Sequence, residues 1–205
     1  MWSAKADHYF FVDAQVVNLS KVMSMQTHYF IGINVPEAAA KELAEARGQW
    51  GLHSHKKYTR PQDMHVTLLF IGSAEETQLQ AAAQALEEIS QAPFDLAING
   101  VKTFGNPQTP RIIYAAIEDS APLVELQEKV KEIVRIFDLS TDLKSFVPHI
   151  TLAAKWAGGK EMEEAPVFEL PSISFRVEEF SLFRIEPQNM RKYVPQATYR
   201  LQEGV

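Results

Sequence analysis

The chain has 205 residues, 46% of them hydrophobic and 22% charged, which is the composition of an ordinary soluble globular protein. It contains no cysteine, so disulfide bonds, thiolate metal ligands and a cysteine nucleophile are excluded. A net charge of −6 argues against non-specific binding along duplex nucleic acid, but it allows a short anionic substrate in a local positive pocket.

The N-terminal residues 1–24 carry no capped or periodic element, and Met23 or Met25 could each begin a self-sufficient domain. Asp7 and Asp13 interrupt any apolar stretch that could act as a signal peptide. No apolar run approaches the roughly 20 residues that a membrane-spanning helix needs. We therefore expect a flexible or non-native extension over 1–24, a main domain over 25–205 and a cytoplasmic location.

The first half of the main domain alternates strands and helices. Residues 28–35 are expected to form a strand, and residues 37–50 place apolar side chains on one helical face. A second strand is expected over 64–71. Ser73 and Glu76 form a capping box that predicts the start of the next helix.

The second half begins with two strands, 94–104 and 111–118, which are joined by a turn-rich segment. A third helix is expected to start near Ser120 and Pro122. Further strands are expected over 147–154, 173–186 and 197–201. Three helices among about seven strands predict an α+β class with a sheet that is at least partly antiparallel.

Positive charge is concentrated in residues 53–60, where no acidic residue intervenes. The simplest interpretation of such a run is a solvated loop. Its position immediately before the first motif described below also allows a role in binding an anion.

Two matching motifs are the most informative feature of the sequence: His65-Val66-Thr67-Leu68 and His149-Ile150-Thr151-Leu152. Successive residues of a strand point to opposite faces, so each strand offers one imidazole and one hydroxyl on the same side. The alternation sends Val66, Leu68 and Phe70 to the opposite, core face.

Either motif alone is better explained by a structural histidine on a half-buried strand. Two such motifs with matching threonines, each followed by leucine, are expected by chance in on the order of one sequence in several thousand. The pair therefore indicates a functional site with His65, Thr67, His149 and Thr151 as its centre.

The pattern resembles the two-histidine (2H) phosphoesterases, and within them the RNA 2′,3′-cyclic phosphodiesterases, which are also called 2′-5′ RNA ligases. The resemblance runs from about His28 to Leu201. It includes the runs from Arg60 to Gly72, from Val147 to Leu152 and from Phe180 to Ile185. It implies two pseudo-symmetric lobes, each a mainly antiparallel sheet backed by helices, with a central active-site cleft.

The resemblance also implies an activity: hydrolysis of RNA 2′,3′-cyclic phosphate ends to 2′-phosphates without metal, ATP or another cofactor. In some relatives this comes with reversible 2′-5′ ligation of RNA ends. One histidine would act as general base and the other as general acid. Relatives suggest His149 as base and His65 as acid, with Thr67 and Thr151 donating hydrogen bonds to the phosphate oxygens. A monomer acting on RNA termini is expected.

Substrate-binding candidates surround the motifs. Phe70 could lie near the nucleotide or belong to the core, and Arg60 could meet a phosphate or fix its loop. Many relatives carry an arginine where this chain has Ala154; strand alternation would put the following Lys155 on the face of the motif, where it could substitute. Tyr193 and Tyr199 could stack on a base, but packing is the better explanation for both.

Two other functions remain open at the level of sequence. One is a non-catalytic nucleotide- or RNA-binding module on the same fold. The other is a 2H phosphodiesterase for a different substrate, such as 2′-5′ oligoadenylate or ADP-ribose cyclic phosphate. Resemblance of fold cannot choose among these.

Overall fold

The structure is a computed structural model that describes residues 27–139, 145–158 and 168–202. The expected extension over 1–24 lies outside the described residues. Nine strands form one sheet in the described part of the chain, and every pairing is antiparallel. The strands are β1 (Tyr29–Asn34), β2 (His55–Tyr58), β3 (His65–Gly72), β4 (Phe94–Phe104), β5 (Ile112–Ile117), β6 (His149–Trp156), β7 (Ser174–Val177), β8 (Glu179–Ile185) and β9 (Tyr193–Arg200).

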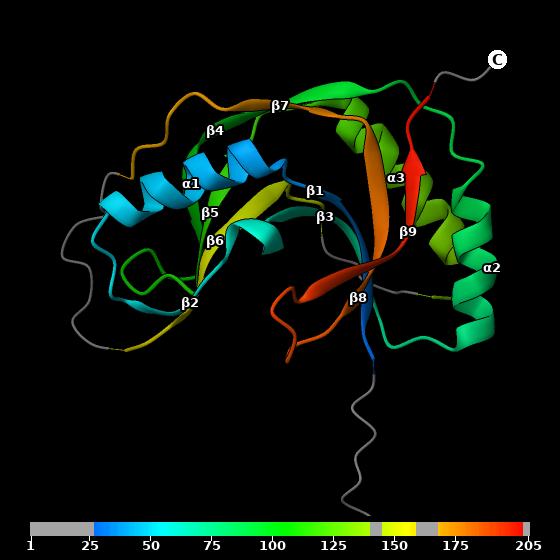
Figure 1. The fold of residues 1–205 in the computed structure, drawn as a ribbon, viewed down its shortest axis with the longest axis horizontal. Helices are drawn as coiled ribbons and strands as arrows, with labels where there is room; N and C mark the ends of the chain where they lie inside the picture. The colour runs from blue at the N-terminus through cyan, green and yellow to red at the C-terminus, as the bar shows by residue number, and fades with distance from the viewer. Residues whose placement is uncertain (1–26, 140–144, 159–167, 203–205) are drawn as a thin grey trace, which may run out of the picture.

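The two motif strands are neighbours at the middle of this sheet (Figure 1). The strand order is β7-β4-β5-β6-β3-β1-β8-β9, with β2 paired to the edge of β6 beyond β3. β3 and β6 meet at one paired position, Val66 opposite Ile150. The sheet therefore consists of two halves that meet here: β3 is the inner strand of one half, with β1, β8 and β9, and β6 is the inner strand of the other, with β5, β4 and β7.

Three helices in the described ranges support the sheet: α1 (Glu37–Gln49), α2 (Glu76–Leu86) and α3 (Ala121–Ile136). Helix α3 packs against β3 and α2, whereas α1 packs against β6 and the short 3₁₀ helix η2 (Pro61–Asp63). Each motif strand thus has its own helix behind it, and Figure 1 shows α1 and the α2–α3 pair at opposite ends of the molecule. None of the described helices is long and apolar enough to cross a membrane.

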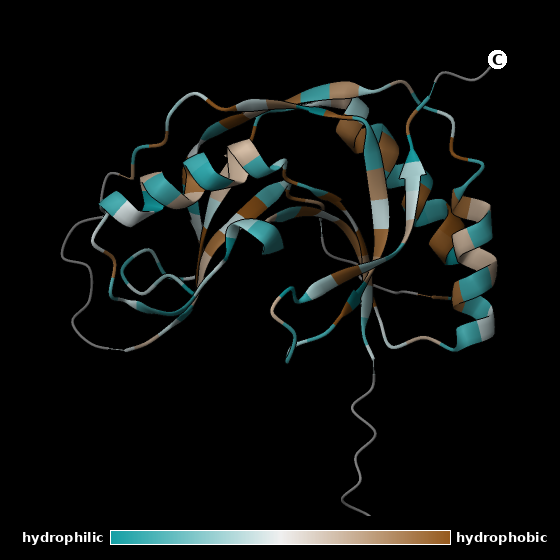
Figure 2. Ribbon diagram, viewed as in Figure 1, coloured by the Kyte–Doolittle hydropathy of each residue, from teal (hydrophilic) through white to brown (hydrophobic). Residues whose placement is uncertain are grey.

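The hydrophobic core lies between the sheet and the helices. The even-numbered motif residues Val66, Ile150 and Leu152 are completely buried, as are Leu123 and Leu126 of α3. Figure 2 shows the hydrophobic residues gathered on the central strands and on α3. Burial of these side chains fixes the register of both motif strands, because a slip by one residue would turn the apolar side chains toward solvent.

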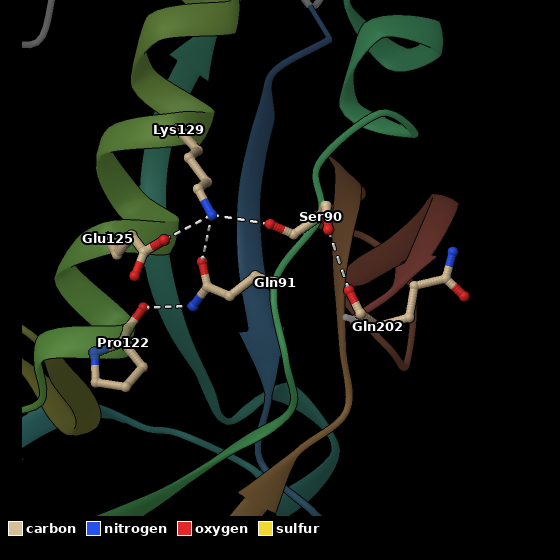
Figure 3. Close-up of polar contacts among 6 residues, drawn as sticks. All are labelled: Ser90, Gln91, Pro122, Glu125, Lys129 and Gln202. Atoms are coloured by element: carbon tan, nitrogen blue, oxygen red, sulfur yellow. Dashed lines mark hydrogen bonds and ion pairs between the residues drawn. The ribbon is translucent and has the colours of Figure 1, made fainter. Parts of the chain in front are cut away.

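A polar network fastens α3 to the chain segments beside it (Figure 3). Lys129 Nζ donates to the carbonyl of Ser90 at 2.8 Å and lies 2.7 Å from a carboxylate oxygen of Glu125. The side-chain amide of Gln91 donates to the carbonyl of Pro122 at 2.7 Å, and its backbone N–H donates to the carbonyl of Gln202 at 3.0 Å. The network holds the N-terminal half of α3 in place while its apolar face packs on the sheet.

Most predicted elements are present, and the differences have local causes. Helix α3 starts where it was predicted, and Ser120 caps it, since its hydroxyl accepts from the N–H of Leu123 at 3.4 Å. The capping box at Ser73 is wrong: α2 begins at Glu76 behind Glu75, and no side chain caps it.

The segment predicted as one strand over 173–186 is two strands, with a break at Glu178. The break occurs because the chain changes sheet neighbours there: β7 pairs with β4 at one edge, and β8 pairs with β1 in the other half. The last strand also starts earlier than predicted, at Tyr193.

Candidate active site

Both motif strands contain a β-bulge at the leucine of the motif. On β3, Thr67 and Leu69 lie opposite the consecutive residues Gly32 and Ile31, so Leu68 is an extra residue. On β6, Thr151 and Ala153 lie opposite the consecutive residues Tyr114 and Ile113, so Leu152 is extra. The two motifs therefore share an irregularity of backbone as well as a sequence.

The approach of β1 to the first bulge requires a glycine. A Cβ atom built on Gly32 would lie 2.7 Å from the carbonyl oxygen of Val66. Such a contact is too close for any other residue, so Gly32 lets β1 pair closely with the strand that carries His65.

The antiparallel register brings each histidine opposite the other motif's threonine. Val66 pairs with Ile150, and one residue further in each direction the register sets His65 opposite Thr151 and Thr67 opposite His149. Residues directly opposite one another on the same face have Cβ atoms about 4.5–5.5 Å apart. The cavity linings agree with this register, because His65 and Thr151 line one cavity and Thr67 and His149 line another.

A cavity adjoins each pair. The lysine-side cavity, of about 290 Å³, is lined by His65 and Thr151 together with Lys57, Lys192 and others. The phenylalanine-side cavity, of about 590 Å³, is lined by His149 and Thr67 together with Phe70, Phe104, Phe146 and others. The two cavities differ in chemistry although the motif pair is the same in both.

Each imidazole is anchored through the same ring nitrogen. Nδ1 of His65 donates to the carbonyl of Asp63 at 2.8 Å, and Nδ1 of His149 donates to the carbonyl of Val147 at 2.7 Å. A carbonyl oxygen can only accept, so Nδ1 carries a hydrogen in both rings. Within the described residues no hydrogen bond occupies Nε2 of either ring, and this nitrogen is the one available for proton transfer.

Aromatic rings flank each imidazole. His65 lies 4.7 Å from Phe30 and 4.6 Å from Tyr193, measured between ring centroids. His149 lies 5.1 Å from Phe104 and 5.2 Å from Tyr114. These rings limit the rotation of the imidazoles and exclude water from one side of each. Sequence reasoning missed Phe30, Phe104 and Tyr114, because their proximity depends on pairing between distant strands.

The surroundings disfavour a positive charge on either imidazole of the free protein. Burial lowers the pKa of His65 from its ordinary value to about 4; the proximity of His149 contributes to this decrease, and the hydrogen bond to Asp63 opposes it. Burial also lowers the pKa of His149, and its bond to Val147 opposes this. Both rings are therefore held as neutral bases until something anionic enters the site.

A helix side chain supports the bulge of each motif strand. Arg47 of α1 donates through Nη1 to the carbonyls of Leu152 at 2.9 Å and of Thr59 at 2.6 Å. Gln127 of α3 donates to the carbonyl of Leu68 at 3.5 Å. Arg47 joins β6 to the chain just after β2, so it is a positioning residue. No motif or spacing in the sequence distinguishes it from the other charged residues of its helix.

Phe70 lies on the face of the site, which contradicts the strand alternation expected from the sequence. Its side chain is 45% exposed and lines the phenylalanine-side cavity, while Leu69 and Ile71 are buried instead. The cause is the bulge at Leu68, which reverses the alternation beyond it. The core-facing prediction for Phe70 is therefore wrong, and its proximity to the site is clear.

The bulge at Leu152 has the same effect on β6. Ala154 lines the lysine-side cavity, and Lys155 does not. The expectation that Lys155 shares the face of His149 and Thr151 is thus wrong, because the bulge reverses the alternation and Lys155 has a positive φ of 62°. The cation that faces the cavity beside Ala154 is Lys57 of β2, its direct partner in the sheet.

The basic run over 53–60 is not a loop throughout. His55 and the three residues after it form β2 on the edge of β6, and His55 is buried with Nε2 bonded to the carbonyl of Pro110 at 2.8 Å. Arg60 does not line either cavity; its guanidinium donates to the carbonyl of Met190 at 3.2 Å. This contact matches the loop-fixing alternative for Arg60.

The two candidate tyrosines differ. Tyr193 lines the lysine-side cavity beside His65, and burial raises its pKa. Tyr199 is buried and stacks on Phe180 with centroids 4.9 Å apart, so it belongs to the core. Across the described ranges, no three histidine, aspartate or glutamate residues gather as ligands of one metal ion.

The sequence matches a known family over most of its length. Residues 35–189, which include all four motif residues, match the family model of the 2′-5′ RNA ligase superfamily. The chain therefore belongs to the 2′-5′ RNA ligase superfamily, as the paired motifs predicted.

Curated relatives show to which family within the superfamily the chain belongs. The chain is 32% identical over 171 residues to the RNA 2′,3′-cyclic phosphodiesterase of Bacillus subtilis, an alignment that covers 82% of this chain and 93% of that protein. It is 31% identical over 173 residues to the enzyme of the same name from Thermus thermophilus, over 77% of this chain and 81% of that protein. Within the superfamily the chain is a member of the RNA 2′,3′-cyclic phosphodiesterase family of enzymes.

Solved structures share the fold. E. coli LigT complexed with 3′-AMP superposes with a TM-score of 0.73 at 18% identity and covers 86% of this chain and 99% of its own. The protein TT0787 of Thermus thermophilus superposes with a TM-score of 0.73 at 26% identity, over 87% of this chain and 100% of its own. The α+β fold with an antiparallel sheet and three helices is therefore of the LigT kind.

Proposed function

We propose that this chain hydrolyses 2′,3′-cyclic phosphate ends of RNA to 2′-phosphates, by histidine acid–base catalysis and without metal or ATP. The observation that carries the proposal is the pair of imidazoles, each anchored through Nδ1 and each opposite a threonine of the neighbouring strand. Reversible 2′-5′ ligation of RNA ends belongs to the proposal, because it is the same displacement at phosphorus with the 5′-hydroxyl of a second RNA end in place of water.

The steps follow from the two free Nε2 atoms. In the assignment suggested by relatives, Nε2 of His149 takes a proton from water as the water oxygen forms a bond to phosphorus. The bond between phosphorus and the ribose 3′-oxygen breaks, and Nε2 of His65 gives its proton to that oxygen. The product is a 2′-phosphate, and the two histidines have exchanged protonation states. Each role is typically worth about 10²–10⁴-fold in rate.

The lowered pKa of His65 makes its protonation depend on the substrate. An imidazole with a pKa of about 4 is neutral at pH 7, and a general acid must be protonated. A bound phosphate diester carries a negative charge, which raises the pKa of a neighbouring imidazole. The substrate therefore helps to charge the acid that acts on it.

The threonines have a complementary role. Thr67 and Thr151 would donate their hydroxyl hydrogens to the non-bridging phosphate oxygens, where negative charge accumulates in the transition state. Opposite each threonine is a histidine, so one oxygen can be held on either side of the phosphorus atom.

The two halves of the sheet, we propose, are pseudo-symmetric lobes with the active-site cleft where β3 meets β6. Three features recur in both halves: the bulge after the threonine, the carbonyl anchor two residues before the histidine, and a pair of aromatic rings around it. Such recurrence is what duplication of one lobe would leave.

The predicted substrate-binding residues take unequal parts in this proposal. Phe70 would contact the nucleotide from the phenylalanine-side cavity. Arg60 and Lys155 lie outside both cavities, so their contribution would be to longer RNA or to the shape of the rim. Bound 3′-AMP in the LigT structure supports a nucleotide ligand for this fold. The working form remains predicted as a cytoplasmic monomer that acts on RNA termini.

The test is incubation of the purified chain with a short RNA that ends in a 2′,3′-cyclic phosphate, with and without excess chelator. We expect equal turnover in both conditions and a product whose phosphate resists 3′-specific phosphatase action, as a 2′-phosphate does. Activity that chelator abolishes would contradict the metal-free mechanism. Binding of the RNA without turnover would indicate a non-catalytic module, and turnover of only 2′-5′ oligoadenylate or ADP-ribose cyclic phosphate would indicate another substrate.

A further inference from the structure

The lysine-side cavity and its immediate surroundings carry more positive charge than a cyclic phosphate can neutralise. Lys57 from β2 and Lys192 from the segment before β9 line it. Lys57 is the direct sheet partner of Ala154, whose small side chain leaves that side of the cavity to the lysine. Both lysines share the cavity with the catalytic pair His65 and Thr151.

The charges in this region are unbalanced. The proximity of Lys155, together with burial and the proximity of Lys192, lowers the pKa of Lys57, so the three ammonium groups are close enough to repel one another. Within the described residues no carboxylate forms an ion pair with Lys57 or Lys192.

The acidic residue lining this cavity is Asp63, which is 3% exposed and accepts through Oδ1 from the backbone N–H of Lys192 at 2.9 Å. Lys57 and Lys192 against Asp63 leave one positive charge in the cavity. Lys155 does not line the cavity, but it is close enough to Lys57 to lower the pKa of that lysine, and it adds a second positive charge beside the cavity. A cyclic phosphate diester supplies one negative charge, so one positive charge is left for a second anion.

The other cavity has a different character. Phe70, Phe104 and Phe146 give it three aromatic side chains, which suit a nucleobase. A terminal nucleotide that places its base there and its cyclic phosphate between the histidines directs its 5′ side to the remaining cavity. In RNA, the 5′ oxygen of the terminal nucleotide carries the phosphodiester that links it to the preceding nucleotide.

We infer that Lys57 and Lys192 form a binding site for this second phosphate, the phosphodiester on the 5′ side of the terminal nucleotide. The inference rests on the proposed function and names its substrate class: RNA chains rather than nucleoside 2′,3′-cyclic phosphates. A charged phosphate oxygen bound to lysine gives a charge-assisted hydrogen bond, which is stronger than a neutral one. The enzyme therefore distinguishes an RNA end from a free nucleotide by the charge behind the reacting group.

The kinetic test compares two substrates, adenosine 2′,3′-cyclic phosphate and a trinucleotide that ends in the same group. We expect kcat/KM of the wild-type chain to be at least about tenfold higher for the trinucleotide. Lys57→Met and Lys192→Met should each lower kcat/KM for the trinucleotide by about tenfold more than for the mononucleotide. Lys56→Met is the matched control, since Lys56 precedes Lys57 on β2 and does not line the cavity. This control should leave the ratio unchanged.

Two kinetic outcomes would overturn the inference. An equal loss on both substrates would assign the lysines to the reacting phosphate, and no loss on either would remove them from binding altogether. Equal kcat/KM of the wild-type chain for the trinucleotide and the mononucleotide would also overturn the inference. Thermal melting of each variant shows whether a loss arises from unfolding.

A binding measurement separates this inference from the proposed function. Calorimetric titration with 3′-AMP and with adenosine 3′,5′-bisphosphate compares one phosphate with two on the same nucleoside. We expect the bisphosphate to bind at least about tenfold more tightly to the wild type, and Lys57→Met to remove most of this difference. Tighter binding of the bisphosphate without turnover of cyclic-ended RNA would support the second-phosphate site and contradict the proposed hydrolase function. Turnover of cyclic-ended RNA with equal affinity for the two nucleotides would support the hydrolase function and contradict the second-phosphate site.

Discussion

The two motif strands carry the same four-residue pattern, but they face different surroundings. On the β3 side, His65 is enclosed by Phe30 and Tyr193, and its pKa falls to about 4. On the β6 side, His149 borders the larger cavity with its phenylalanine side chains. In the proposed mechanism the common part performs proton transfer, which needs one imidazole as base and one as acid. The parts that differ are the ones that we propose recognise the substrate, with its base on one side and its phosphodiester chain on the other.

The largest effect on activity is expected from the loss of either histidine. His65→Ala and His149→Ala should each lower kcat for cyclic-ended RNA by at least about 10²-fold, because each removes one of two proton transfers. The double variant should be little worse than either single one, because two groups that act as a unit are not additive. Single-turnover rates measure this.

Retained affinity is the control for the histidine variants. Both should still bind 3′-AMP, since the threonines and the lysines remain. A single variant with near wild-type kcat would mean that the two halves are not equivalent in chemistry and that one histidine is structural.

The pH dependence of the rate should depend on the protonation of both imidazoles. In the proposed mechanism the productive free enzyme has one neutral and one protonated ring, and both pKa values are lowered by burial. Above about pH 6.5 both rings are neutral in nearly all molecules, so kcat/KM should fall by about tenfold per pH unit there. Below about pH 4 both rings become protonated and the rate falls again.

The optimum of kcat/KM is therefore expected on the acidic side of about pH 6.5, the ordinary histidine pKa. The optimum of kcat should lie at higher pH, since the bound phosphate raises both pKa values. Initial rates from about pH 4 to about pH 9, at low and at saturating RNA, measure both profiles. A kcat/KM optimum above about pH 7 would contradict the role of burial.

A smaller effect on activity is expected from replacement of Phe70, one of the aromatic side chains that line the larger, phenylalanine-side cavity. Phe70→Ala should raise KM for cyclic-ended RNA by about tenfold and change kcat little, because stacking on a base is worth about 1–3 kcal/mol. Ile136→Ala of α3 is a suitable control, since its side chain is 69% exposed and lines neither cavity of the site. An unchanged KM in Phe70→Ala would assign the base to another surface.

Local alternation in the sequence predicted the core of the site, and it failed where the backbone stops alternating. His65 and Thr67 share a face because both precede the bulge, as do His149 and Thr151. Phe70 and Lys155 follow the bulges, so strict alternation predicts the wrong face for both.

Other parts of the site depend on contacts between segments that are distant in the chain. Lys57 owes its place to pairing of a four-residue strand with β6, and such a short polar strand has no periodic signal of its own. The aromatic rings around each histidine have the same origin. The motif could therefore be predicted from the sequence, whereas most of the cavity walls could not.

The smallest expected effects concern the side chains that support the two bulges. Arg47 is half-buried and donates to two carbonyls, with its guanidinium 5.6 Å from the ring centroid of Tyr58. Gln127 makes one long bond to Leu68, and its buried Oε1 has no hydrogen-bond partner within the described residues. Arg47→Met should therefore lower the free energy of unfolding by about 1–3 kcal/mol, because hydrogen bonds from a charged donor are lost.

Gln127→Met is the matched variant, and it should change stability by less than about 1 kcal/mol, because removing a weak bond also removes an unsatisfied buried oxygen. Urea unfolding followed by fluorescence compares the two. Since Arg47 also holds the carbonyl that follows Thr151, its loss should lower kcat as well, while Gln127→Met should not. Equal destabilisation by both variants would mean that the two bulges are supported alike, and that the asymmetry of the site begins only in its cavities.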